Sequence, residues 1–315
     1  METENHTSVT SFILSGMSDI PEYQITLFLV FLTLYLLNLL GNIVMMALIV
    51  TDPKLKTPMY FFLCNLSFVD MCFTSVTVPK LLADFLSKSK IISYPGCMAQ
   101  MYFFLAICVN ECFLLSIMAY DRYVAICNPL HYVMVMNRML CSVMVTGCWT
   151  ISQLHSLLHT LLMSQLSFCR SNIIDHFFCD LPPLLKLSCS DIFTNELVIF
   201  IEGAVIGTGT FLCIIISYIC IFSTILGIQS AEGRHKAFST CSSHLIVVTL
   251  FFGSAFFTYY RTSSSYNQNK NQLVTVMYTI ITPMLNPFIY SLRNNEVKRA
   301  LKRAIGRRRR HVQKM

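Results

Sequence analysis

The sequence predicts an all-α membrane protein, a bundle of seven transmembrane helices with a short amphipathic helix on the cytoplasmic side after the last span. The 315 residues are 55% hydrophobic and only 12% charged, which is too apolar for a water-soluble domain of this length. Long apolar stretches also recur, each at or above the roughly 20 residues that a helix needs to cross the hydrocarbon core. They cover residues 23–50, 58–82, 97–126, 140–163, 195–227, 237–260 and 271–292.

The chain should divide into an extracellular tail (1–22), the seven-helix domain (23–292) and a basic cytoplasmic tail (293–315). The N-terminal tail lacks the basic region and cleavage site of a signal peptide, so we expect it to stay on the mature chain. Asn5 begins an Asn-His-Thr glycosylation acceptor, which is used only on the lumenal or extracellular side. Most lysines and arginines would then lie inside. We expect a multi-pass protein of the plasma membrane, with its N-terminus outside.

The basic tail contributes to the net charge of +7. Anionic lipid attracts such a segment at about 1 kcal/mol per charge, so we interpret it as a topology and lipid anchor in the bilayer. Nucleic acid is not expected as a partner.

Four of the 14 cysteines lie outside the membrane segments or at their outer ends. Cys97 begins the third segment, whereas Cys169, Cys179 and Cys189 fall in the long loop before the fifth. An even number of cysteines in an oxidising compartment predicts two disulfides, although spacing leaves three pairings open. The loop, Leu162 to Asp191, is also rich in apolar residues, which favours a folded lid over a flexible linker.

Prolines mark two of the segments. Pro58 and Pro79 are expected to bound the second, and Pro283 and Pro287 to interrupt the seventh. A proline inside a membrane helix frees a backbone carbonyl, which a neighbouring polar side chain such as Asn286 can satisfy. A static kink and a movable joint are both consistent with this pattern.

Two acidic residues stand in mid-membrane, Asp70 in the second segment and Glu111 in the third. An unpaired carboxylate at that depth is costly, so each must be protonated, paired or bound to a cation. With Asn42 and Asn286 they could form an oxygen-rich cluster for a monovalent cation such as sodium. The alternative is a pair of protonated or water-bridged acids that only join the helices.

An Asp-Arg pair, Asp121 and Arg122, ends the third segment and is followed by Tyr123. Ionic residues at the membrane boundary are functional candidates, since burying a charge costs roughly 2.5–3.5 kcal/mol even on insertion scales. Arg122 should pair with Asp121 or with polar groups of the sixth segment, and breaking that pairing would act as a switch. Simple snorkelling of an interfacial arginine is the alternative.

The outer halves of the segments carry aliphatic, aromatic and small polar residues that suit a small lipophilic ligand. Glu202 is the only charged candidate there, and its alternative role is a water-exposed acid near a loop. The full candidate set is Phe104, Leu105, Cys108, Val109, Glu202, Ile206, Phe252, Phe256 and Tyr259.

The sequence gives no support for an enzyme, because it has no phosphate loop, nucleophile elbow or other catalytic pattern. His155 and His159 stand four residues apart in the fourth segment. As two potential zinc ligands without a third ligand or a carboxylate nearby in sequence, they are thin evidence for a metal site.

Five motifs carry a resemblance to the olfactory (odorant) receptors, a branch of the rhodopsin-like G-protein-coupled receptors, over nearly the whole chain. They are Gly41-Asn42, LKTPMY at 55–60, MAYDRYVAIC at 118–127, KAFSTCSSHL at 236–245 and PMLNPFIYSLRN at 283–294. The extra loop cysteines and the HFFCD run at 176–180 resemble the tetrapod-type class.

This resemblance implies a receptor that binds an odorant beneath the second extracellular loop and activates the stimulatory olfactory G protein, raising cyclic AMP. By similarity, Cys97 pairs with Cys179 and Cys169 pairs with Cys189. Other residues also receive roles from the resemblance: a cation site at Asp70 and Glu111, ligand contact at Tyr259 and the outer third helix, and an activation switch at Asp121, Arg122, Tyr123, Tyr218, Asn286, Pro287 and Tyr290.

Two positions depart from the family pattern. Lys56 stands where family members usually have histidine, and Phe252 where they usually have tyrosine. Phe252 lacks a hydroxyl that could bind the ligand or the third helix, so we expect a more apolar pocket floor.

A channel or transporter is the main alternative from another class, but it would need a continuous polar path or two related halves. Within receptors, the alternative is a chemosensory receptor for a metabolite outside the nose. The identity of the ligand cannot be read from these residues, because one methylene changes binding by only about 1–3 kcal/mol.

Overall fold

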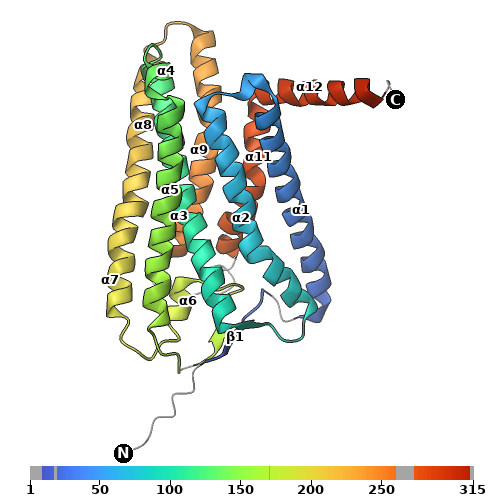
Figure 1. Cartoon of the computed structure of the whole chain (residues 1–315), viewed down its shortest axis with the longest axis vertical. Coiled ribbons are helices and arrows are strands. Elements are labelled where there is room, and N and C mark those ends of the chain that lie inside the picture. Colours follow the sequence, from blue (N-terminus) through green and yellow to red (C-terminus); the bar gives the residue numbers. More distant parts are fainter. Residues whose placement is uncertain (1–8, 18–19, 170, 260–272, 313–315) are drawn as a thin grey trace, which may run out of the picture.

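The computed structural model describes residues 9–17, 20–169, 171–259 and 273–312. Within them, long helices run side by side from one end of the molecule to the other (Figure 1). The first five spans are formed by α1 (Pro21–Thr51), α2 (Pro58–Leu86), α3 (Tyr94–Cys127), α5 (Arg138–Ser164) and α7, η2 and α8 (Phe193–Glu202, Gly203–Thr208, Gly209–Leu226). The sixth is α9 (Ala231–Tyr259), and the seventh contains η4 (Met277–Ile281) and α11 (Thr282–Arg293).

Six of the described helices are long and apolar enough to cross a membrane by length and composition. The remaining span, α5, has 27 residues and is equally long, but it carries more polar side chains, among them Gln153, His155 and His159. The seven-helix fold predicted from the sequence is confirmed, and most helix ends lie within a few residues of the ends of the apolar stretches.

Local sequence fixes where several helices begin. The Ser93 hydroxyl accepts from the Gly96 amide at the start of α3, and Asn137 accepts from the Leu140 amide at the start of α5. Pro58 begins α2, where a missing N–H costs nothing. Pro79 does not end that helix as expected, because α2 continues for two further turns to Leu86. Tertiary packing thus overrides the break that a proline favours.

The core of the bundle centres on α3, which packs against α2, α5 and α8. On the other side, α1 packs against α2 and α11. Gly41 permits the close approach to α11, because a Cβ there would lie 2.9 Å from the Pro287 ring. The Gly41-Asn42 motif therefore brings the first and seventh spans together.

A small three-stranded sheet closes the end of the bundle where the described chain begins (Figure 1). Strand β1 (Ser11–Leu14) lies in the middle, antiparallel to β2 (Ile91–Ser93) and parallel to β3 (Ile173–Ile174). Inside it, Phe12 is fully buried and packs edge-on against Phe168. The N-terminal tail is therefore part of the folded cap.

The folded lid predicted between the fourth and fifth spans is confirmed. It contains β3 and the short helix α6 (Leu181–Leu185), and it buries Phe177, Phe178 and Leu184. Both disulfides implied by the resemblance are present, Cys97 with Cys179 and Cys169 with Cys189. The first joins the lid to α3, and the second closes the lid on itself.

The opposite end of the bundle carries helix α12 (Asn295–Val312), which lies crosswise to the spans (Figure 1). Its apolar side buries Val297 and Ala300. Arg303 is 2.8 Å from an Asp52 carboxylate oxygen, just after α1. This confirms the amphipathic helix predicted after the last span and places it at the other end of the bundle from β1.

Candidate functional site

A layer of aromatic rings lies directly under the lid. Phe104 of α3 is fully buried, with its ring centroid 4.5 Å from Phe178 of the lid and 5.2 Å from Phe73 of α2. Tyr278 of η4 is also fully buried and lies 6.3 Å from Phe104. Because four elements contribute to this layer, the lid and the helices beneath it form one packed unit.

Hydrogen bonds position the lid beside its disulfide. The Gln100 side chain accepts from the Cys179 amide at 2.9 Å and donates to the Val76 carbonyl of α2 at 3.0 Å. Next to Cys179, His176 is buried between the rings of Phe177 and Phe178. Burial lowers the pKa of His176 to about 4, so its ring is neutral at physiological pH.

The predicted ligand residues fall into different surroundings. On α3, Phe104, Leu105 and Val109 are buried, whereas Cys108 is half-buried. Ile206 of η2 and Phe252 of α9 are also half-buried, and Phe252 lies 5.5 Å from the ring of Phe211.

Two candidates on α9 stand apart. Phe256 is 59% exposed and so lacks the buried surroundings of Phe104. The side chain of Tyr259, at the end of α9, lies outside the described part of the chain, as does all of Asn5.

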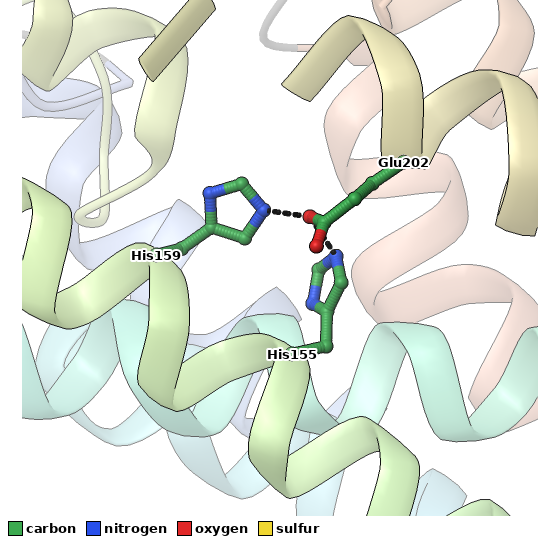
Figure 2. Close-up of side chains that lie close together, drawn as sticks. All are labelled: His155, His159 and Glu202. Carbon is green, nitrogen blue, oxygen red and sulfur yellow. Dashed lines mark hydrogen bonds and ion pairs between the residues drawn. The ribbon is translucent and has the colours of Figure 1, made fainter. Parts of the chain in front are cut away.

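Glu202, the charged candidate, faces α5 (Figure 2). Its Oε2 atom is 2.5 Å from Nε2 of His159 and 3.0 Å from Nε2 of His155. The two histidines are one helical turn apart, which puts both rings on the same side of α5. The sequence shows the histidine pair but gives no sign that Glu202 joins it, because the rotation of a helix about its axis is set by packing.

A second polar cluster occupies the middle of the bundle. The Asn286 amide donates to both carboxylate oxygens of Asp70, at 2.9 and 3.1 Å. The sequence suggested that Asn286 bonds to a carbonyl freed by a proline. Among the described residues, its amide bonds to Asp70 instead. Among the described residues, both oxygens of the fully buried Glu111 have no hydrogen-bond partner, and the same holds for the side-chain oxygens of Asn286 and Asn42.

The first span adds further donors to this cluster. Asn42 donates to Asn38 at 2.5 Å, and Asn38 in turn donates to Thr74 at 2.5 Å and to the Asp70 carbonyl at 3.2 Å. This network connects α1, α2 and α11 around the carboxylate of Asp70. Its unpartnered oxygens are hard donors of the kind that a small alkali cation prefers, so the residues fit a sodium ion.

At the C-terminal end of α3, Asp121 bonds to a residue other than Arg122. Asp121 accepts a hydrogen bond of 2.9 Å from the Tyr132 hydroxyl of α4 (Tyr132–Val135). Burial and the nearby Asp121 raise the pKa of Tyr132, which keeps this hydroxyl protonated. Arg122 is buried, and within the described residues it makes no ion pair with a carboxylate. Of the two partners predicted for Arg122, Asp121 therefore forms no ion pair with it among the described residues and accepts from Tyr132 instead. The alternative, pairing with polar groups of the sixth span, stays a prediction.

Arg122 instead lies within electrostatic range of two buried tyrosines, Tyr218 of α8 and Tyr290 of α11. The Tyr290 hydroxyl has no hydrogen-bond partner among the described residues. Tyr123, the next residue on α3, is half-buried. Pro287 lies inside α11, between Asn286 and Tyr290.

One residue in this region was not singled out by the sequence. His244 of α9 is fully buried, with Nε2 3.0 Å from the Leu115 carbonyl of α3 and Nδ1 2.9 Å from the Tyr218 hydroxyl. A carbonyl only accepts, so Nε2 must donate and Nδ1 accepts from the tyrosine. The neutral ring therefore joins three spans. A polar residue in the apolar sixth segment was the available signal.

This arrangement defines a class of protein: a seven-helix membrane receptor, with a covalently anchored lid at one end and, at the other, a buried arginine that makes no ion pair with a described carboxylate. The comparisons with known proteins carry the assignment further. The olfactory receptor family profile matches residues 31–308. The chain is 56% identical to olfactory receptor 1G1 of Gorilla gorilla gorilla, over 97% of both chains.

Human olfactory receptor 1L4 is also 56% identical, over 96% of this chain and 98% of its own. Mouse olfactory receptor 5AR1 is 51% identical over 98% of this chain and 99% of its own. The chain belongs to the olfactory receptor family. It is thus a multi-pass G-protein-coupled receptor and not an enzyme, as the motifs predicted.

Proposed function

We propose that this receptor binds small volatile or lipophilic odorants within the helix bundle and activates a stimulatory, olfactory-type G protein, which raises cyclic AMP. The observation that carries the proposal is the state of Arg122, a buried guanidinium without an ion pair to any described carboxylate. A permanent charge in that position is poised to meet a partner that approaches the inner end of the bundle.

The outer half supports the ligand part of the proposal. We propose ligand contacts at the nine candidate residues of α3, α7, η2 and α9, with the lid above them. Buried aromatic and aliphatic walls with few polar groups suit a ligand held mainly by shape. Phe252 adds a wall without a hydroxyl, which favours apolar ligands over polar ones.

The residues of the inner half support the proposed activation switch. An odorant that contacts α3, α8 and α9 better in an open arrangement shifts the population toward it. We propose that α9 then moves outward at its inner end and uncovers Arg122. We propose that the residues near Arg122 change their contacts in this step, namely Asp121, Tyr123, Tyr218, Asn286, Pro287 and Tyr290.

We also propose that the receptor resides in the plasma membrane with its N-terminus outside, so that residues 1–22 and the lid are extracellular and residues 293–315 are cytoplasmic. The disulfides support this orientation, because they form in an oxidising compartment. Glycosylation at Asn5 would follow from the same orientation. Antibody labelling of a tag at each terminus, in intact and in permeabilised cells, tests it.

We further propose that Asp70 and Glu111, with Asn42 and Asn286, hold a sodium ion that stabilises the inactive arrangement. The unpartnered oxygens of Glu111 and Asn286 support this assignment. Replacing sodium by a large organic cation should raise basal signalling of the wild type but not of Asp70→Asn. Equal sodium dependence in both proteins would rule the site out.

The decisive experiment uses Arg122→Ala in cells with a cyclic AMP reporter, screened against a panel of volatile compounds. We expect the variant to reach the cell surface but to lose the odorant response. Arg138→Ala is the matched control, because Arg138 is exposed at the start of α5. Normal signalling by a well-expressed Arg122→Ala variant would overturn the proposed coupling. A ligand-evoked current without a cyclic AMP response would favour a channel instead.

A further inference from the structure

We propose that His155, His159 and Glu202 form a binding site for one divalent transition-metal ion, of which Zn²⁺ is the representative. The site joins α5 to α7 in the outer half of the bundle (Figure 2). Two imidazoles and one carboxylate are a ligand set found in zinc sites that keep a fourth position open for water or another ligand. This inference does not depend on the odorant or on the G protein.

The geometry brings three ligand atoms to one point. One ligand atom from each of His155, His159 and Glu202 lies within 4.8 Å of the others, and Nε2 of both histidines approaches Oε2 of Glu202. In a tetrahedral zinc site, bonds of about 2.0–2.2 Å place neighbouring ligand atoms about 3.3–3.6 Å apart. Small side-chain rotations therefore convert the present hydrogen-bonded arrangement into a coordination sphere.

The protonation chemistry also permits coordination. Each Nε2 now faces the same carboxylate oxygen, whereas the buried Nδ1 atom of each ring has no partner among the described residues. A carboxylate oxygen only accepts, so in the present hydrogen bond Nε2 of His159 carries the proton. No hydrogen bond to a described residue holds Nδ1, so the proton can move to Nδ1 when a metal takes its place at Nε2. With the proton on Nδ1, both Nε2 lone pairs point at the metal.

The ligand types select the class of ion. Ca²⁺ and Mg²⁺ prefer oxygen ligands, whereas imidazole nitrogen suits zinc, copper and nickel. An ion at this site would also balance the carboxylate charge of Glu202 inside an apolar segment.

The position of the proposed site in the fold indicates what a bound ion would do to the helices. The side chain of Glu202 is 22% exposed, compared with 2% for His159, so Glu202 forms the more accessible side of the site. His159 lies five residues before the outer end of α5, a depth of about 7–8 Å along the helix. The π-helical turn η2 starts directly after Glu202. Bound metal would therefore hold α7 to α5 at the point where the fifth span departs from regular α-helical geometry.

The first experiment measures thermal unfolding of the purified full-length receptor in lipid nanodiscs. With Zn²⁺ at about a hundred times its Kd, we expect Tm to rise by about 3–5 °C, and a chelator should reverse the shift. Mg²⁺ at the same concentration should have no effect. Glu202→Gln, which keeps the size of the side chain, and His159→Ala should abolish the shift.

His131→Ala is the matched control, because His131 is exposed in the segment between α3 and α4, at the other end of the bundle. This variant should keep the full zinc response. An equal zinc shift in Glu202→Gln and the wild type would overturn the proposal, since the ion would then bind elsewhere.

A second experiment tests ligand identity directly and does not rely on stability. Co²⁺ in place of Zn²⁺ should give one equivalent of the visible absorption typical of tetrahedral nitrogen and oxygen ligation. The band should vanish in His155→Gln and His159→Gln. Binding to the free cysteines would differ, because thiolates add intense charge-transfer absorption in the near ultraviolet. Absence of both the cobalt band and the zinc shift in the wild type would show that the three side chains form only a hydrogen-bonded cluster.

Discussion

The two halves of the bundle are held together by different means; we call the half that carries the lid the outer half and the half that carries α12 the inner half, after the orientation proposed above. At the outer end, two disulfides, a three-stranded sheet and a layer of fully buried rings fix the lid to α3 and to the N-terminal tail. At the inner end, the connections between spans include single hydrogen bonds from His244, Tyr132 and Tyr60. Covalent and sheet contacts are not exchanged readily, whereas single hydrogen bonds are. The outer half is therefore built to keep its shape and the inner half to change partners.

The largest expected effect comes from removing the covalent link. Cys179→Ala should destabilise the fold by about 2–5 kcal/mol and reduce surface expression to near background, because the lid loses its anchor on α3. Antibody staining of intact cells measures this. Cys213→Ala is the control, since Cys213 is free and exposed. Near-normal expression of Cys179→Ala would mean that the sheet and aromatic layer alone hold the outer half.

A smaller change should act on signalling rather than on folding. His244→Ala removes the hydrogen bonds to Leu115 and Tyr218, each worth about 0.5–1.5 kcal/mol. Freed from α3 and α8, the inner end of α9 should open more often and raise basal cyclic AMP. Tyr218→Phe, which removes only one of the bonds, should give a smaller rise.

The control for this comparison is His235→Ala, because His235 is exposed on the same helix. Basal cyclic AMP should be read after normalisation to surface expression. If well-expressed His244→Ala signals at the wild-type level, the hydrogen bonds of this histidine do not hold the inner half closed.

The smallest expected effect is a pH dependence of the stability of the fold, which arises from His176 in the lid. Burial lowers the pKa of His176 from its ordinary value of 6.5 to about 4. The unfolded chain therefore takes up a proton near pH 6.5 and the folded chain only near pH 4, so folded stability falls as pH decreases through this window. At pH 5 the loss is about 2 kcal/mol or less.

Thermal unfolding at pH 7.5 and pH 5 measures this loss of stability. The wild type should lose more stability on acidification than His176→Gln, whose side chain does not titrate. All other histidines are shared by the two proteins and cancel in the comparison. Equal acid sensitivity would show that the lid relaxes enough to hydrate His176.

The sequence predicted the parts of this structure that depend on local chemistry. Long apolar segments give the seven spans, and the position of four cysteines gives a disulfide-bonded lid. The tail strand was not predicted, because Ser11–Leu14 has few residues and its partners lie far along the chain. The pairing partners themselves decide whether so short a segment becomes a strand.

Within the site, the sequence identified charged residues but not their partners. Asp121 was expected to meet Arg122 but bonds to Tyr132, and Glu202 was not linked to His155 and His159. Partner choice depends on how each helix is rotated about its axis. For Glu202, the next residues form the π-helical turn η2. The hydrophobic periodicity of the fifth segment did not predict this turn.

The central position of β1 has a consequence for biosynthesis. Ile13 pairs with both Ile91 and Ile173, so one of the earliest segments to leave the ribosome cannot reach its final place until most of the lid has been made. Until then both of its edges are unpaired and can bond to other chains. The order of synthesis therefore makes the assembly of this cap a late step, with a period of exposure to aggregation before it.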